Sequence, residues 1–187
     1  MMVEVFTKLF DILISNLIIL ITYLSILIFC SIIFLNEKYL IYAYFPFGIL
    51  VLGFLFFGNK VIFGFTIGHV IYYILSKKFN LNLYFNSYFI LSICYITCVP
   101  VTLLILNKLK INVGIGHSYK LDKSNIYHVI LITLFSSVIF LFLTLFFAFL
   151  HPLNFNNYFY FFGNFIGGSL LILILKLIVH FAGYFKI

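Results

Sequence analysis

The sequence predicts an all-α fold, a polytopic transmembrane helix bundle. Of its 187 residues, 65% are hydrophobic and only 8% are charged, and the mean hydropathy is +1.26. A soluble domain is about half apolar and about a quarter charged, so this composition cannot supply a soluble surface. The apolar residues also form runs that approach the roughly 20 residues a membrane helix needs. We therefore expect a single integral membrane domain over residues 1–187, with nothing left for a soluble catalytic domain.

Six apolar runs define the expected spans. The second run is short for a full crossing, so a short, broken or partly re-entrant helix is expected there. Pro100 is expected to kink the fourth span, and Ser124 or Asn125 to cap the fifth. The expected spans cover residues 9–35, 46–58, 61–76, 87–107, 125–150 and 159–176.

The basic residues predict the orientation of the bundle. All eleven are lysines, and the formal net charge is +7. Because lysines favour the cytoplasmic ends of spans, six spans with both termini in the cytoplasm place most of them inside and the lysine-free loop 151–158 outside. Lys77 and Lys78 are the exception. The positive charge indicates anionic lipid headgroups rather than nucleic acid as the partner. The expected location is a bacterial inner membrane, with an organellar membrane as the alternative.

The stretch 44–69 interrupts the apolar sequence most often. Pro46 removes a backbone donor and favours a helix start or a break. The residues Gly58, Asn59 and Lys60 are a turn signal. Gly64 and Gly68, four residues apart, share one face of a helix and allow another helix to approach closely. Gly163 and Gly167 have the same spacing in the sixth span. We therefore expect spans three and six to pack on each other through these glycine faces.

Three polar or backbone-breaking positions define the expected ligand-binding site: Pro46, His69 and Asn164. His69 is the ionisable side chain placed deepest between glycines, and a polar group at membrane depth usually faces protein or water. Pro46 is expected to leave backbone groups unpaired nearby. Asn164 can hydrogen-bond across helices. Asn59 was considered, but the expected topology places it at the opposite membrane surface.

Catalytic and metal-binding patterns do not occur. The spans carry no Ser/His/Asp arrangement and no carboxylate pair, and no two histidines share a helix face, so no enzyme activity, metal site or cofactor is predicted. All four acidic residues lie at span ends or in loops, which disfavours an ion-coupled pump. Cys30, Cys94 and Cys98 lie in apolar runs and are interpreted as small buried hydrophobes.

Five short stretches occur along the chain in this order: Phe45–Leu52, Phe57–Lys60, Gly64 with Ile67–His69, Ile132–Ser137 and Tyr160–Gly168. They resemble the membrane-associated sensor (MASE-type) domain of bacterial histidine kinases and diguanylate cyclases. Asn164 stands where that family has Asp, and the family has about eight spans. The resemblance implies a sensor-like membrane domain, here without an output domain, that acts through a membrane or cytoplasmic signalling partner.

Two other functions fit the size and hydrophobicity of the chain. One is the substrate-binding membrane component of a small-molecule transporter, which a polar pocket between spans three and six would favour. The other is a structural subunit of a larger membrane complex, which a large apolar surface without a pocket would favour.

Overall fold

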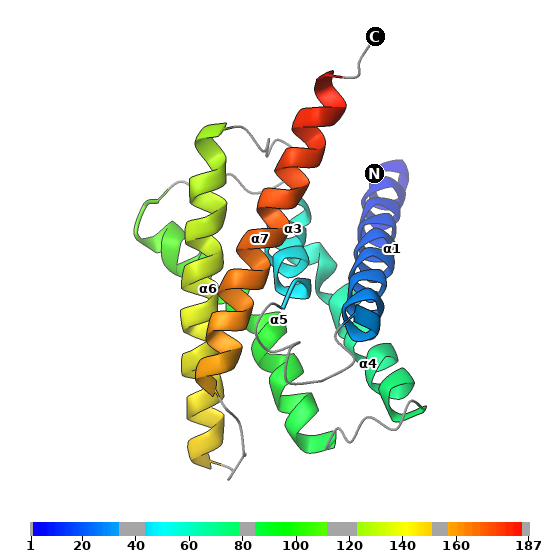
Figure 1. Cartoon of the computed structure of the whole chain (residues 1–187). Helices are drawn as coiled ribbons and strands as arrows, with labels where there is room; N and C mark the ends of the chain where they lie inside the picture. Colours follow the sequence, from blue (N-terminus) through cyan, green and yellow to red (C-terminus); the bar gives the residue numbers. More distant parts are fainter. Residues whose placement is uncertain (1, 34–43, 79–84, 112–122, 151–156, 185–187) are drawn as a thin grey trace.

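The computed structural model describes residues 2–33, 44–78, 85–111, 123–150 and 157–184, and the expected all-α fold is confirmed across these ranges (Figure 1). Six α-helices and one short 3₁₀ helix follow one another without a strand in the described ranges. Each expected span corresponds to one helix, and the ends agree within two residues except that α1 begins seven residues earlier and α7 ends eight residues later than expected. The elements are α1 (Met2–Ile33), α3 (Pro46–Phe57), η1 (Gly58–Val61), α4 (Ile62–Lys78), α5 (Phe85–Lys108), α6 (Lys123–Leu150) and α7 (Asn157–Tyr184).

Within the described ranges, five stretches are long and apolar enough to cross a membrane: Val5–Cys30, Pro46–Leu75, Phe89–Lys108, Tyr127–Phe147 and Phe161–Ile178. The chain is therefore an integral membrane protein. The second stretch is divided, because Gly58 has φ 65°, a backbone conformation that glycine adopts without strain. The division leaves α3 with 12 residues, about 18 Å of helix, which is shorter than the hydrocarbon core of a bilayer.

Contacts between helices fix their directions. Lys60 of η1 and then Gly64 and Gly68 of α4 meet successively later residues of α1, so α1 and α4 run parallel. At the start of α3, the Tyr44 N–H donates a hydrogen bond to Gly163 O of α7, and further along the chain Gly48 lies against Gly168. Because later residues of α3 meet later residues of α7, these two helices are also parallel. Figure 1 shows the start of α1 and the end of α7 at the same end of the bundle.

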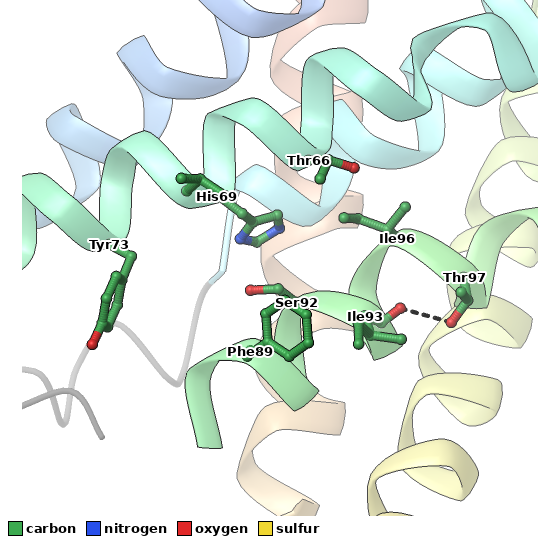
Figure 2. A pocket seen from close by; sticks show the side chains of 9 residues that line it. Thr66, His69, Tyr73, Phe89, Ser92, Ile93, Ile96 and Thr97 are labelled. Atoms are coloured by element: carbon green, nitrogen blue, oxygen red, sulfur yellow. Dashed lines mark hydrogen bonds between the residues drawn. The ribbon is translucent and has the colours of Figure 1, made fainter. Parts of the chain in front are cut away.

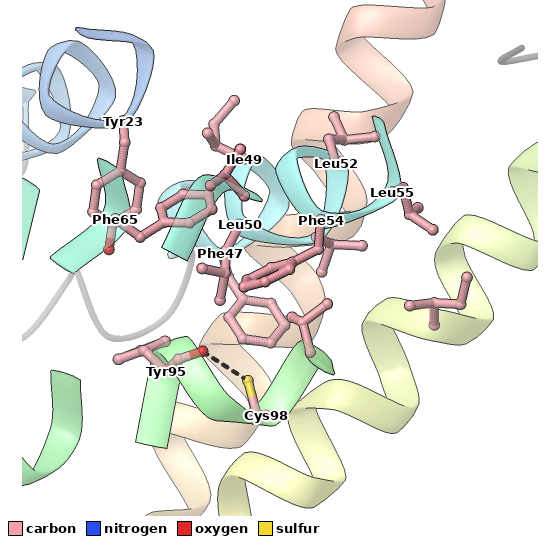
Figure 3. Packing of buried hydrophobic residues seen from close by; sticks show 14 of the residues in the cluster. Tyr23, Phe47, Ile49, Leu50, Leu52, Phe54, Leu55, Phe65, Tyr95 and Cys98 are labelled. Atoms are coloured by element: carbon pink, nitrogen blue, oxygen red, sulfur yellow. Dashed lines mark hydrogen bonds between the residues drawn. The ribbon is translucent and has the colours of Figure 1, made fainter. Parts of the chain in front are cut away.

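The short helix α3 lies at the centre of the core (Figure 3). Every residue from Pro46 to Leu55 is buried. A helix that is apolar all round is suited to burial on all sides, and α3 contacts α1, α5, α6 and α7. Its Phe54 ring stacks on Phe65 of α4 at 5.7 Å between ring centroids. The uniform hydrophobicity of α3 thus explains why a half-length helix occupies the middle of the bundle.

Glycines allow the closest helix approaches, but with partners other than those expected. A Cβ atom on Gly64 would lie 2.6 Å from the backbone oxygen of Asn16 in α1. A Cβ atom on Gly168 would lie 2.9 Å from Thr133 in α6, and one on Gly48 would lie 2.9 Å from the backbone oxygen of Gly168. The predicted pairing of spans three and six through their glycine faces is therefore wrong. The α4 glycines face α1 instead, and Gly168 of α7 faces α3 and α6.

The residues expected to serve this packing all lie in the interior. Gly64, Gly68, Gly163 and Gly167 are buried. Gly68 faces Tyr23 of α1. The pattern of glycines thus marks close-packed positions, while the identity of the helix opposite depends on how the bundle assembles.

Candidate functional site

His69 lies on α4 with only 4% of its surface exposed. Its Nε2 atom and the hydroxyl oxygen of Tyr23 on α1 are 2.8 Å apart in a buried hydrogen bond, whose donor depends on the imidazole tautomer. On another side, the His69 ring stacks on Tyr95 of α5, with 6.0 Å between ring centroids. A polar side chain at this depth thus has partners on two neighbouring helices, as burial within a bilayer requires.

Asn164 lies on α7 and is completely buried. The hydroxyl of Tyr95 donates to Asn164 Oδ1 over 2.7 Å. Within the described part of the chain, the amide nitrogen Nδ2 has no hydrogen-bond partner. Turning the amide over would exchange the roles of its two ends and leave the oxygen unbonded instead. Asn164 therefore retains one unused polar atom in the interior, where an unsatisfied group is costly.

Pro46 begins α3 inside the bundle and is buried. The unpaired backbone groups expected beside it are not found at the neighbouring amides. The N–H groups of Phe47 and Gly48 donate to the carbonyl oxygens of Tyr44 and Phe45, and the Tyr44 N–H donates to Gly163 O over 2.9 Å. These backbone N–H groups at the start of α3 are therefore all hydrogen-bonded, two of them within a tight turn. The role of Pro46 in the structure is to begin this helix where a missing N–H costs least.

Tyr95 connects the three expected positions. It stacks on His69 and bonds Asn164, and its ring lies 5.2 Å from that of Tyr44, two residues before Pro46. Tyr95 and Tyr23 are not among the predicted site residues, because tyrosine is common at headgroup depth and is therefore a weak signal for a buried site. The available signal was position: Tyr95 lies within an apolar run, where a buried phenol needs a hydrogen-bond partner.

A crevice of about 260 Å³ opens beside His69 between α4 and α5. Figure 2 shows His69 and Ser92 facing one another from these two helices. Ser92 and Tyr73 are buried, whereas Thr66, Val70 and other wall residues are exposed on the outer surface of the bundle. We call this feature the α4–α5 crevice. It is lined by Thr66, His69, Val70, Tyr73, Phe89, Ser92, Ile93, Ile96 and Thr97.

The exposed polar residues of the turn η1 lie apart from this region. Asn59 is exposed in the turn η1. Next to it, Lys60 forms an ion pair with Asp11, and both side chains are more than a third exposed. Across the described ranges, no group of three His, Cys, Asp or Glu side chains is placed to hold a metal ion. The buried polar residues around Tyr95 and the adjoining crevice are therefore the candidate site.

The fold and the site define a polytopic, all-α integral membrane protein with a polar cluster inside its helix bundle. Comparison of the chain with protein-family models, with curated proteins and with solved structures found no match.

Proposed function

We propose that the chain is an integral membrane sensor-like domain that binds a ligand beside His69 and acts through a partner protein. The observation that carries the proposal is the placement of Tyr95 between His69 and Asn164. Residues of α4, α5 and α7, distant in sequence, are joined at one point beside the α4–α5 crevice. A ligand that contacts His69 can thereby change the packing of α5 and α7, and a partner can detect that change.

The membrane-associated sensor resemblance supports the same proposal, because its segments include Phe45–Leu52, His69 and Asn164. Asn164 in place of Asp makes the cluster uncharged on the α7 side. The ligand therefore needs no charge to match Asn164, and recognition by shape and hydrogen bonds is the expected mode. Under this proposal the protein has no catalytic role.

The proposal is tested on the full chain extracted in mild detergent. Native mass spectrometry should detect a small molecule retained by the wild-type protein, and His69→Ala should lose it while circular dichroism and gel filtration remain unchanged. Tyr127→Phe, at a position 76% exposed, is the control and should retain the molecule. Equal retention by His69→Ala and wild type would show that His69 is not part of a ligand site.

Signalling through a partner requires a separate measurement. Cross-linking in native membranes should give a protein adduct whose yield changes by a factor of several between wild type and His69→Ala, as expected for a population shift of about 1 kcal/mol. If His69→Ala loses the ligand but gives the same yield of cross-linked adduct as the wild type, ligand binding does not control the partner contact. That result would contradict the sensor role.

A substrate-binding component of a transporter is the second candidate. The short helix α3, which begins inside the bundle, favours it, because discontinuous helices often adjoin transport sites. In this case the retained molecule should exchange across the membrane only when a transporter partner is present in the vesicles. Ligand-dependent cross-linking without transport favours the sensor.

A further inference from the structure

The depth of the α4–α5 crevice indicates how a ligand reaches it. Lys60 and Asp11 form an exposed ion pair, which belongs near a membrane surface because charges are costly in hydrocarbon. His69 is nine residues further along the chain, about 14 Å of helix at 1.5 Å per residue. Half of the hydrocarbon core is about 15 Å. The crevice therefore lies near the middle of the bilayer, and its open side faces lipid.

The walls of the crevice are unfavourable for water as the occupant. Although five of the nine lining residues carry a polar atom, the surface they present to the crevice is almost entirely apolar. The hydroxyls of Thr66 and Thr97 already donate to the carbonyl oxygens of Ile62 and Ile93 in their own helices. An ordered water needs two to four polar partners, so a crevice with such walls does not retain water well. Leaving about 260 Å³ empty is also unfavourable, because wall atoms without neighbours lose dispersion contacts.

The lining and the volume of the crevice also indicate which apolar ligand fits. No lysine is among the residues that line the crevice, and a carboxylate at this depth requires a positive partner. The volume lies below the roughly 300–1,000 Å³ of drug-sized sites, which fits one chain better than a ring system with substituents. A chain whose headgroup stays at the membrane surface meets both conditions.

We propose that the α4–α5 crevice holds one acyl chain of a bilayer phospholipid, which enters sideways between α4 and α5 and ends against His69 and Ser92. This inference rests on the proposed function, because it names the ligand class of the same site. An acyl-chain site of this kind makes the protein a detector of the surrounding lipid. The length and packing of the acyl chains determine how far the crevice is filled, and His69 lies at the inner wall that the chain reaches.

The test uses the full chain reconstituted in phosphatidylcholine vesicles that contain a small fraction of phosphatidylcholine with a diazirine midway along one acyl chain. After irradiation, peptide mass spectrometry locates the adducts. Adducts should concentrate on the crevice residues Val70 and Ile96, above the level on the exposed α7 residue Ile166. Equal adduct yields per exposed residue at both places would overturn the proposal, because they indicate only the ordinary lipid contact of a membrane helix.

Two matched variants make the result specific. Ile93→Trp places a larger side chain in the crevice, at a position 39% exposed, and should lower the adducts on Val70 by about fivefold or more because a filled site no longer admits the chain. Ile166→Trp, 43% exposed on α7, should leave them unchanged. Equal effects of the two variants would contradict the proposal. Gel filtration confirms that both remain folded.

Further measurements distinguish the source of the chain and separate the two proposals. A diazirine-labelled free fatty acid is used in parallel, and adducts from it alone would overturn the phospholipid assignment. If His69→Ala loses a retained molecule but phospholipid adducts avoid the crevice, the ligand-binding function stands and the ligand class is wrong. If adducts fill the crevice and His69→Ala alters neither retention nor partner cross-linking, the crevice is a lipid site and the sensor function fails.

Discussion

Tyr95 is the residue on which the buried polar cluster depends. Its hydroxyl bonds Asn164, its ring stacks on His69, and its ring centroid lies 4.4 Å from that of Phe140 on α6. Hydrogen bonds between membrane helices contribute about 0.6–1.7 kcal/mol. Aromatic pairs contribute about 0.5–1.5 kcal/mol beyond their buried area. Loss of the hydroxyl alone should therefore weaken the bundle without removing the ring packing.

Tyr95→Phe should lower the free energy of unfolding by about 1–2 kcal/mol, because Asn164 then has both ends of its amide unbonded in the interior. Denaturation in mixed detergent micelles, followed by circular dichroism, measures the change. Tyr127→Phe removes an exposed hydroxyl and is the control. If the two substitutions have the same effect, the bond between Tyr95 and Asn164 does not stabilise the fold.

The two α4 glycines should differ in their tolerance of a methyl group. A Cβ atom on Gly64 meets the backbone oxygen of Asn16 at 2.6 Å, whereas one on Gly68 meets the Tyr23 ring at 3.1 Å. Backbone cannot move aside as a side chain can, so Gly64→Ala should destabilise the protein by about 1–3 kcal/mol and Gly68→Ala by less. Thermal unfolding in detergent ranks the two variants. The reverse order would show that α1 and α4 are not packed as described.

At the scale of elements, one side chain joins α1 to the turn before α4. Asn16 Nδ2 donates to Lys60 O over 2.6 Å, and Asn16 Oδ1 accepts the Gly64 N–H over 2.6 Å. Asn16 thus satisfies backbone groups at the start of α4, as a capping residue does within a single helix. The sequence alone indicates no partner for Asn16.

Asn16→Leu should lower the free energy of unfolding by about 1–3 kcal/mol, because both backbone groups lose their partner. Thr22→Val, also on α1, is the control: the Thr22 hydroxyl bonds only the carbonyl of Ile18 in its own helix, among the bonds observed. Protease susceptibility of the turn should rise in Asn16→Leu and stay unchanged in Thr22→Val. A stable, protected Asn16→Leu protein would mean that helix packing alone holds α1 against α4.

At the scale of the whole molecule, the helix directions place the start of α1 and the end of α5 at one end of the bundle (Figure 1). Lys8, Lys60, Lys108 and Lys110 belong to this end. The positive-inside rule therefore predicts that it is cytoplasmic, as the lysine pattern of the sequence also predicts. The chain therefore passes along the bundle four times between these points, in α1, the short α3, α4 and α5.

Single cysteines at Lys110 and Asn156, in a chain whose own cysteines are replaced by alanine, test this orientation. Asn156 lies between α6 and α7 in the sequence and should react with a membrane-impermeant maleimide added to intact cells. Lys110→Cys should react only after the cells are opened, because α6 runs between the two positions. Reaction of Lys110→Cys but not of Asn156→Cys from outside would reverse the orientation, and reaction of both would contradict the helix directions.

Local patterns in the sequence are enough to predict the class of protein and the approximate positions of its helices. Apolar runs and interruptions such as Pro46 and Gly58 act locally, so the helix α3 begins at Pro46 and ends before Gly58, as the sequence predicts. Burial of the glycines at 64 and 68 follows from the same local pattern. His69 and Asn164 were recognisable because polar residues are rare in such runs.

Which helices contact one another cannot be predicted from these local patterns and is seen only in the folded bundle. Lipid-facing and protein-facing sides of a membrane helix are similarly apolar, so the sequence carries little signal for the partner of each face. The glycine face of α4 therefore packs on α1 rather than on α7. Tyr95 joins His69 to Asn164 for the same reason: the contact exists only once α4, α5 and α7 surround the buried helix α3, and no local pattern encodes that arrangement.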